Sequence, residues 1–80
     1  MPKLPRVSGA EIIRALERLG FVRIRQSGSH VILRRGSKVC VVPMHSEVKV
    51  GTLGGVLRQA EVSAEEFMQA LLRQTAVKLK

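Results

Sequence analysis

His30 begins the most regular strand-like run of the sequence, residues 30–35, and directly follows Gly28 and Ser29. Histidine is the side chain whose unperturbed pKa places proton transfer near neutral pH. The neighbouring sequence carries basic side chains that can bind a phosphate chain, namely Arg23, Arg25, Arg34, Arg35 and Lys38. A proton carrier among phosphate-binding groups indicates chemistry on nucleic acid. The alternative is a histidine that only forms a hydrogen bond at a sheet edge, and the residue pattern by itself favours that alternative.

The residues next to His30 have candidate supporting roles. Ser29 can donate a hydrogen bond to a phosphate oxygen or fix the start of the strand, and Gly28 permits a tight turn. On an ideal strand Arg34 shares the face of His30, with Ile32 between them, so Arg34 is the candidate for stabilising charge in the transition state. The remaining cations are either binding residues or part of a solvated face: Arg23, Arg25, Arg35 and Lys38.

The second histidine, His45, follows Pro43 in a predicted loop over residues 44–49. His45 is either the acid partner of His30 or a loop residue that positions Lys49 and the next helix, and the sequence favours the positioning role. A lysine at a helix start opposes the helix dipole, and a bound phosphate would offset that cost. Lys49 is therefore a candidate binding residue, with a solvated lysine as the equal alternative.

The composition predicts one small basic domain over residues 1–80. Fourteen Lys and Arg against six acidic residues give a net charge of +8. Residues 1–40 hold nine of these cations and two glutamates, so +7 lies in the first half. Such a charge favours an anionic partner, with nucleic acid ahead of an acidic protein and a membrane surface last. With two Phe and no Trp or Tyr, the core must consist of Leu, Ile and Val.

The same composition argues against several classes of protein. There is no Asp, and the glutamates are scattered, which argues against a two-metal nuclease; we expect no metal and no cofactor. Cys40 is the one cysteine and lies between two valines, so it is predicted to be a small buried thiol. No secretory or membrane-spanning segment is recognised. The expected location is therefore the cytoplasm, without membrane contact, and the oligomeric state stays open.

Spacing of apolar residues and turn signals predicts an α+β fold of order α-β-β-β-α-α, in which helices cover one face of a three-stranded antiparallel meander. Ser8 with Glu11, and Ser63 with Glu66, have the spacing of capping boxes. Residues 74–80 are predicted to fray. The predicted elements are a helix over 8–20, strands over 21–26, 30–35 and 38–42, a helix over about 50–60 and a last helix from residue 63.

The first and third strands carry further signals. Val22 and Ile24 alternate with Arg23 and Arg25, which predicts a strand with one solvent-exposed, basic face. Gly36-Ser37 suits a two-residue hairpin turn. Pro43 cannot donate to a sheet ladder and is predicted to end the third strand.

Several short motifs occur together in a fixed order, and over residues 5–72 they resemble the HicA toxin family. Each motif is short, but all of them occur in the family's order and spacing, which makes the resemblance specific. The motifs are Ser8-Gly9, Leu16…Leu19-Gly20-Phe21, Gly28-Ser29-His30, Val42-Pro43-Met44-His45, Lys49…Gly51-Thr52-Leu53 and Leu57-Arg58-Gln59-Ala60…Ser63…Glu66-Phe67.

The resemblance implies a double-stranded-RNA-binding-domain-like fold and the toxin component of a type II toxin–antitoxin system. Members of the family are mRNA interferases, endoribonucleases that cleave mRNA without a ribosome and are inhibited by a HicB-like antitoxin. The family's catalytic histidine corresponds to His30 in this sequence, acting as general acid or base. Two alternatives remain: a non-catalytic RNA-binding module of the same fold, and a basic face that serves to dock an acidic partner.

The sequence departs from the family pattern at Glu61, where a glycine usually follows the Arg-Gln-Ala stretch. If this position needs a positive φ, Glu61 strains the turn. The alternative, which the sequence favours, is that the helix ends differently here. Gly54 and Gly55 are poor helix formers and predict a looser helix over 50–60.

Overall fold

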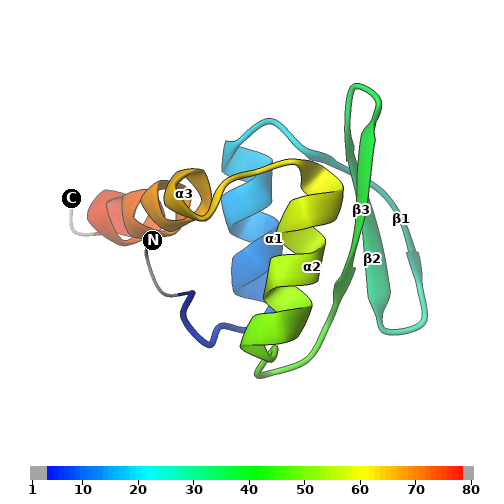
Figure 1. The fold of residues 1–80 in the computed structure, drawn as a ribbon, viewed down its shortest axis with the longest axis horizontal. Helices are drawn as coiled ribbons and strands as arrows, with labels where there is room; N and C mark the ends of the chain where they lie inside the picture. The colour runs from blue at the N-terminus through cyan, green and yellow to red at the C-terminus, as the bar shows by residue number, and fades with distance from the viewer. Residues whose placement is uncertain (1–3, 79–80) are drawn as a thin grey trace.

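The structure, a computed structural model, describes residues 4–78 and confirms the predicted order of elements (Figure 1). One helix is followed by three antiparallel strands and two further helices, which is an α+β fold with an open sheet. The elements are α1 (Gly9–Arg18), β1 (Val22–Ser27), β2 (His30–Arg35), β3 (Lys38–Pro43), α2 (Val50–Ala60) and α3 (Ala64–Lys78).

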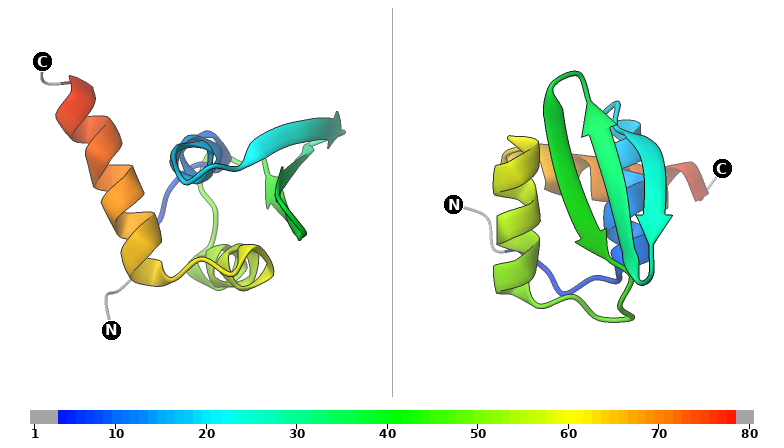
Figure 2. Two further views of the ribbon diagram at one scale, coloured as in Figure 1. Left: turned by 90° about the horizontal axis from the view of Figure 1, so that it is seen from above. Right: turned by 90° about the vertical axis from the view of Figure 1, so that its right-hand side faces the viewer.

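The strands form one sheet in the order β1-β2-β3, with β2 in the centre. Helices α1 and α2 lie on one face of this sheet, and no helix within residues 4–78 covers the other face (Figure 2). Helix α3 packs against α1 and α2 on the side away from the sheet (Figure 1). The prediction that helices cover one face is therefore confirmed.

The core between the sheet and the helices is aliphatic, as the composition predicts. Apart from Phe21 and Phe67, its larger side chains are Ile, Leu and Val, and no polar or charged residue among those described is buried. Cys40, in β3, is fully buried in this core, and burial raises the pKa of its thiol to about 11. The thiol is therefore protonated at neutral pH, and its burial confirms the predicted small buried thiol.

Both predicted capping boxes are present. The Ser8 hydroxyl accepts a hydrogen bond from the Glu11 backbone N–H at 3.1 Å, while the Glu11 carboxylate accepts one from the Ser8 N–H at 2.9 Å. Ser63 and Glu66 repeat this exchange at the start of α3, with both distances at 3.0 Å. These bonds lower the pKa of the Glu66 carboxyl because they stabilise its ionised form.

The strands differ from the prediction mainly in β1. All six residues of this strand are exposed, including Val22 at 66% and Ile24 at 48%. A bulge between Arg23 and Arg25 interrupts the alternation, and β1 is an edge strand of the sheet. The predicted strand is confirmed, but its apolar side is exposed as well as its basic side.

The remaining boundaries lie close to those predicted. The hairpin between β2 and β3 turns at Gly36-Ser37, and β3 includes Pro43 as its last residue. Helix α1 ends at Arg18, two residues before the predicted end. Helix α3 continues to Lys78, and fraying of residues 74–80 stays a prediction, with 79 and 80 outside the described residues.

Glu61 is the one described non-glycine residue with a positive φ, with φ 55° and ψ 44° at the end of α2. The chain must turn here because Ala60 and Val62, on either side, are both buried. The Val62 N–H then donates to the Leu57 carbonyl oxygen at 3.0 Å, closing the helix end. The prediction that the helix ends differently is wrong: the position needs a positive φ, and a glutamate adopts it.

Glu61→Gly should therefore stabilise the protein. Left-handed backbone costs a non-glycine residue roughly 1–2 kcal/mol. The exposed ion pair from Lys38 to Glu61, 2.8 Å long, contributes about 0.2–1 kcal/mol. The difference between these two figures centres on a net gain of about 1 kcal/mol, which corresponds to a rise in Tm of roughly 4–8 °C, measurable by circular dichroism.

Glu61→Ala is the matched control, because it removes the ion pair and keeps the strained backbone. It should not raise Tm. A lower Tm for Glu61→Gly than for the unmodified protein would show that the left-handed conformation carries no cost here.

Candidate active site

His30 is the first residue of the central strand β2 and pairs with Ser27 of β1 and Pro43 of β3. Val31 and Leu33 point into the core, so His30, Ile32 and Arg34 lie on the face that the helices leave open. The His30 side chain is exposed. The sheet thus fixes the backbone of the histidine while leaving its ring accessible.

The turn before His30 holds it against the loop that follows β3. Gly28 has a φ of 58°, in the left-handed region that glycine adopts at little cost. The Ser29 carbonyl oxygen accepts a hydrogen bond from the Met44 N–H at 2.6 Å. The Gly-Ser-His segment is therefore joined to the residue that precedes His45.

The same loop is also hydrogen-bonded to the start of α1 and to the residues that precede this helix. The His45 carbonyl oxygen accepts a hydrogen bond from the Gly9 N–H at 2.9 Å, and the Val48 N–H donates to the Val7 carbonyl oxygen at 2.8 Å. A Cβ atom at Gly9 would overlap the Pro43 carbonyl oxygen, so the close approach needs glycine. Residue type and spacing indicate no reason for this glycine beyond its place in the Ser8-Gly9 motif.

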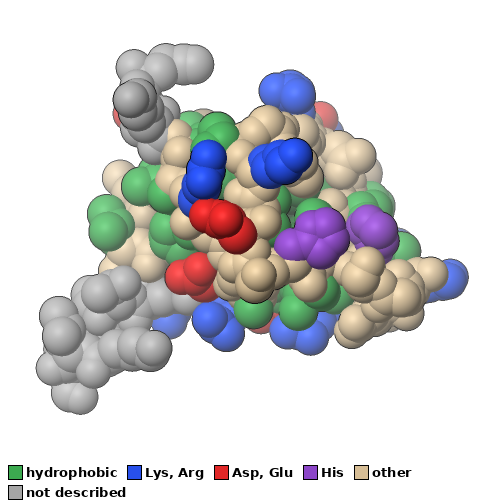
Figure 3. Space-filling model, turned by 90° about the horizontal axis from the view of Figure 1, so that it is seen from below, with side chains coloured by type: hydrophobic (Ala, Val, Ile, Leu, Met, Phe, Trp, Pro, Cys, Tyr) green, Lys and Arg blue, Asp and Glu red, His purple; other side chains and the backbone are tan. Residues whose placement is uncertain are grey.

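His30 and His45 line one pocket, between the end of β3 and the start of α2. Figure 3 shows the two histidines next to each other on one face of the molecule. We call this the histidine pocket. Its other lining residues are Val41, Pro43, Glu47, Val48, Lys49 and Thr52.

The histidine pocket also includes the start of α2. Lys49 is the N-cap residue of this helix, its side chain makes no capping hydrogen bond, and the first turn holds no acidic residue. The uncapped N–H groups of a helix start and its positive dipole end both favour an anion. Lys49, predicted as a binding residue, is thus placed beside His30.

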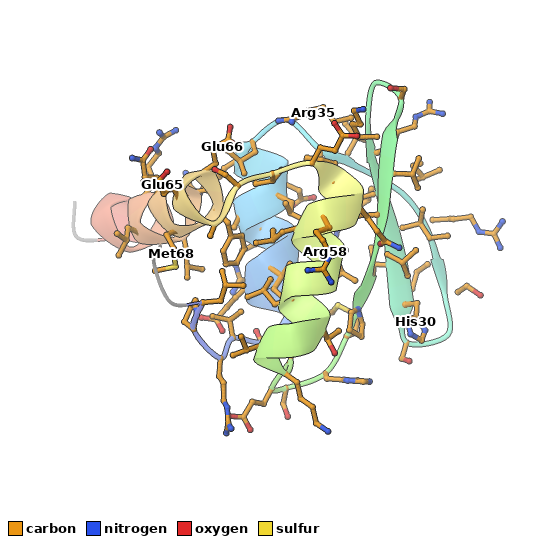
Figure 4. All side chains as sticks on the ribbon, in the orientation of Figure 1. His30, Arg35, Arg58, Glu65, Glu66 and Met68 are labelled. Carbon is orange, nitrogen blue, oxygen red and sulfur yellow. The ribbon has the colours of Figure 1, made fainter. Side chains whose placement is uncertain are left out.

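Arg34 and Arg35 lie at the other end of β2. They line a separate pocket together with three residues of β1, Val22, Arg23 and Ile24. Arg34 lies four positions after His30 along β2, a distance of about 13 Å, and Figure 4 shows His30 and Arg35 at opposite ends of the sheet. The structure confirms that Arg34 shares the face of His30 but does not bring the two together.

Several of the predicted binding cations have partners within the protein. The Arg35 guanidinium lies over the Phe21 ring at 4.8 Å and donates to the Leu19 carbonyl oxygen at 2.7 Å. This geometry gives Arg35 a structural role at the end of α1. Two more of the predicted binding cations form ion pairs, Arg23 with Glu17 at 3.4 Å and Lys38 with Glu61 at 2.8 Å.

Arg25 is the sheet arginine nearest to His30 in register. It pairs with Ile32, while Ser27 pairs with His30, so Arg25 and His30 are diagonal neighbours on the open face. Diagonal neighbours in an antiparallel pair are about 7–8 Å apart, within reach of a long side chain. Arg25 and Lys49 therefore flank His30 from two sides.

In the part of the chain that the structure describes, no group of three or more His, Cys, Asp or Glu side chains is arranged to hold a metal ion. Over the same residues, no helix is both long and apolar enough to cross a bilayer.

A family model described as the HicA toxin of bacterial toxin-antitoxin systems matches residues 9–62. The chain belongs to the HicA toxin family. A comparison with curated proteins found no match.

The match to the HicA family begins at Gly9 and ends at Val62, so it spans α1, the whole sheet and α2. The histidine pocket lies entirely inside it, whereas α3 lies outside. Membership makes the protein the toxin of a toxin–antitoxin system and implies a HicB-like antitoxin as its partner.

Proposed function

We propose that this HicA family toxin is an endoribonuclease that cleaves mRNA in the cytoplasm, with His30 as a general acid or base and without a metal ion. The observation that carries the proposal is the position of His30. Its ring is exposed at the start of β2, in a pocket that it shares with a lysine and the start of α2. A proton carrier beside an anion-binding helix start has the parts needed to cleave a phosphodiester.

RNA supplies its own nucleophile, the 2′-hydroxyl group. Removing its proton allows the 2′-oxygen to attack the adjacent phosphorus, and a proton must reach the departing 5′-oxygen. Nearby cations stabilise the five-coordinate phosphorus between these events. This route yields a 2′,3′-cyclic phosphate and a 5′-hydroxyl group.

The basic residues would bind the RNA backbone on either side of the cleaved phosphate. Arg25 and Lys49 flank His30, while Arg34 lies farther along the open face, about 13 Å away. The net charge of +8 supports an anionic substrate of this kind. The order α-β-β-β-α, shared with double-stranded-RNA-binding domains, supports RNA as that substrate.

The experiment that tests the proposal is incubation of the purified toxin with a defined RNA in the presence of EDTA. We expect cleavage at the same sites and rates with and without EDTA. Binding of RNA without cleavage would support the alternative, a non-catalytic RNA-binding module. Cleavage that stops in EDTA would contradict the metal-independent mechanism.

A further inference from the structure

We propose that His45 is a second catalytic residue of this toxin, and that His30 and His45 divide the two proton transfers of RNA cleavage. The inference rests on the proposed function and assigns a chemical role to a residue for which the sequence favoured a positioning role over that of an acid partner. Its basis is the placement of both histidines in one pocket.

Cleavage through the 2′-oxygen needs two proton carriers in different places. The attacking and leaving oxygens lie roughly in line on opposite sides of the phosphorus. A single imidazole ring cannot contact both oxygens in the same transition state. An enzyme that relies on general acid and general base catalysis therefore needs a second group across the phosphate.

Within the histidine pocket, His45 is the side chain suited to be that second group. Glutamate and lysine side chains ordinarily titrate at about 4.3 and 10.4, whereas histidine titrates near 6.5. Glu47, the carboxylate of this pocket, lies 3.6 Å from the Arg6 guanidinium. His45 is exposed, so its ring is open to a substrate in the pocket.

The loop that carries His45 is attached on both sides, which gives the residue a fixed backbone. The preceding residue, Met44, donates its N–H to the Ser29 carbonyl oxygen at 2.6 Å, next to His30 itself. The His45 carbonyl oxygen accepts from the Gly9 N–H at 2.9 Å. These bonds fix the spacing of the two histidine backbones, as a pair of catalytic groups requires.

The reaction balances with these two residues alone. One histidine, in its neutral form, takes the proton of the 2′-hydroxyl as the 2′-oxygen bonds to phosphorus. The other, in its protonated form, gives its proton to the 5′-oxygen as the P–O5′ bond breaks. The histidines end with exchanged protonation states and return to the starting forms by proton exchange with water.

The test compares two RNA substrates of the same sequence, one of them with sulfur in place of the bridging 5′-oxygen at the cleavage site. A thiolate leaves without protonation because thiols are far more acidic than alcohols. On ordinary RNA, we expect both His30→Ala and His45→Ala to cleave about 10²–10⁴-fold more slowly than the unmodified toxin. On the sulfur substrate, the variant that lacks the general acid should cleave at near the unmodified rate. The variant that lacks the general base should stay slow.

Glu65→Gln is the matched control, because Glu65 is an exposed acidic residue on α3 and does not line the histidine pocket; its rate should stay within about threefold of the unmodified rate. His45→Gln serves as a second variant, and melting curves check that both variants fold. Unimpaired cleavage by folded His45→Ala would overturn this inference alone. A sulfur substrate that rescues both variants or neither would also overturn it. An unmodified toxin that cleaves neither substrate would overturn the proposed function as well.

Discussion

Replacing His30 with alanine should reduce RNA cleavage by about 10²–10⁴-fold, the usual contribution of a positioned general acid or base. The fold should survive, because the His30 side chain is exposed and the core contains no polar residue among those described. We expect Tm to change by no more than a few degrees. The measurements are single-turnover cleavage of a defined RNA and thermal melting of the same preparations.

His30→Asn is the informative companion to this variant. Asparagine keeps a hydrogen-bonding side chain at the start of β2 but cannot exchange a proton near neutral pH. Both variants should be equally inactive and should lose toxicity when expressed in cells. Full cleavage by either folded variant would remove His30 from the mechanism.

Binding of the HicB-like antitoxin should stop cleavage and shield both His30 and His45 from modification by diethylpyrocarbonate. The toxin carries a net charge of +8, so an acidic partner would associate rapidly. A partner that covers the histidine pocket blocks RNA at the same surface. Mass spectrometry of each histidine, in the free toxin and in the complex, measures this shielding.

The antitoxin should also raise the apparent Tm of the toxin, because it binds the folded state. At a free antitoxin concentration of 100 times Kd the stabilisation is about 2.7 kcal/mol, or roughly 10–20 °C for a domain of this size. Histidines that stay as reactive in the inhibited complex as in the free toxin would contradict direct occlusion. Inhibition would then have to act through a distant surface.

Local sequence signals were sufficient to predict most of the fold. The capping boxes at Ser8 and Ser63 mark helix starts because each depends on two residues three positions apart. Strand β2 matched its predicted range, residues 30–35, because its two ends are set by adjacent turns containing Gly28 and Gly36. These elements were predicted correctly because neighbouring residues determine where they begin and end.

The errors concern features that depend on distant parts of the chain. Val22 and Ile24 alternate with arginines as in a half-buried strand, but both side chains are exposed on the edge strand β1. Glu61 adopts a positive φ because Ala60 and Val62 must both enter the core. Residue propensity at Glu61 indicated a different helix end, and tertiary packing overrode it.

The candidate site was predictable in part. His30 and its Gly-Ser turn stand out in the sequence, and so does the basic character of the strands. Sequence distance, however, suggested that Arg34 and Arg35 accompany His30, whereas the fold brings His45 and Lys49 into its pocket. That arrangement depends on the hydrogen bonds from Met44 to Ser29 and from Gly9 to His45, which no periodicity reveals.

The chemical ends of the RNA products test the central claim most directly. Purified toxin is incubated with a defined RNA in EDTA, and the fragments are analysed by mass spectrometry. Attack by the 2′-oxygen, with His30 transferring a proton, predicts a 2′,3′-cyclic phosphate on one fragment and a 5′-hydroxyl group on the other. A 5′-phosphate with a free 3′-hydroxyl group would show that water is the nucleophile and would contradict the proposed mechanism.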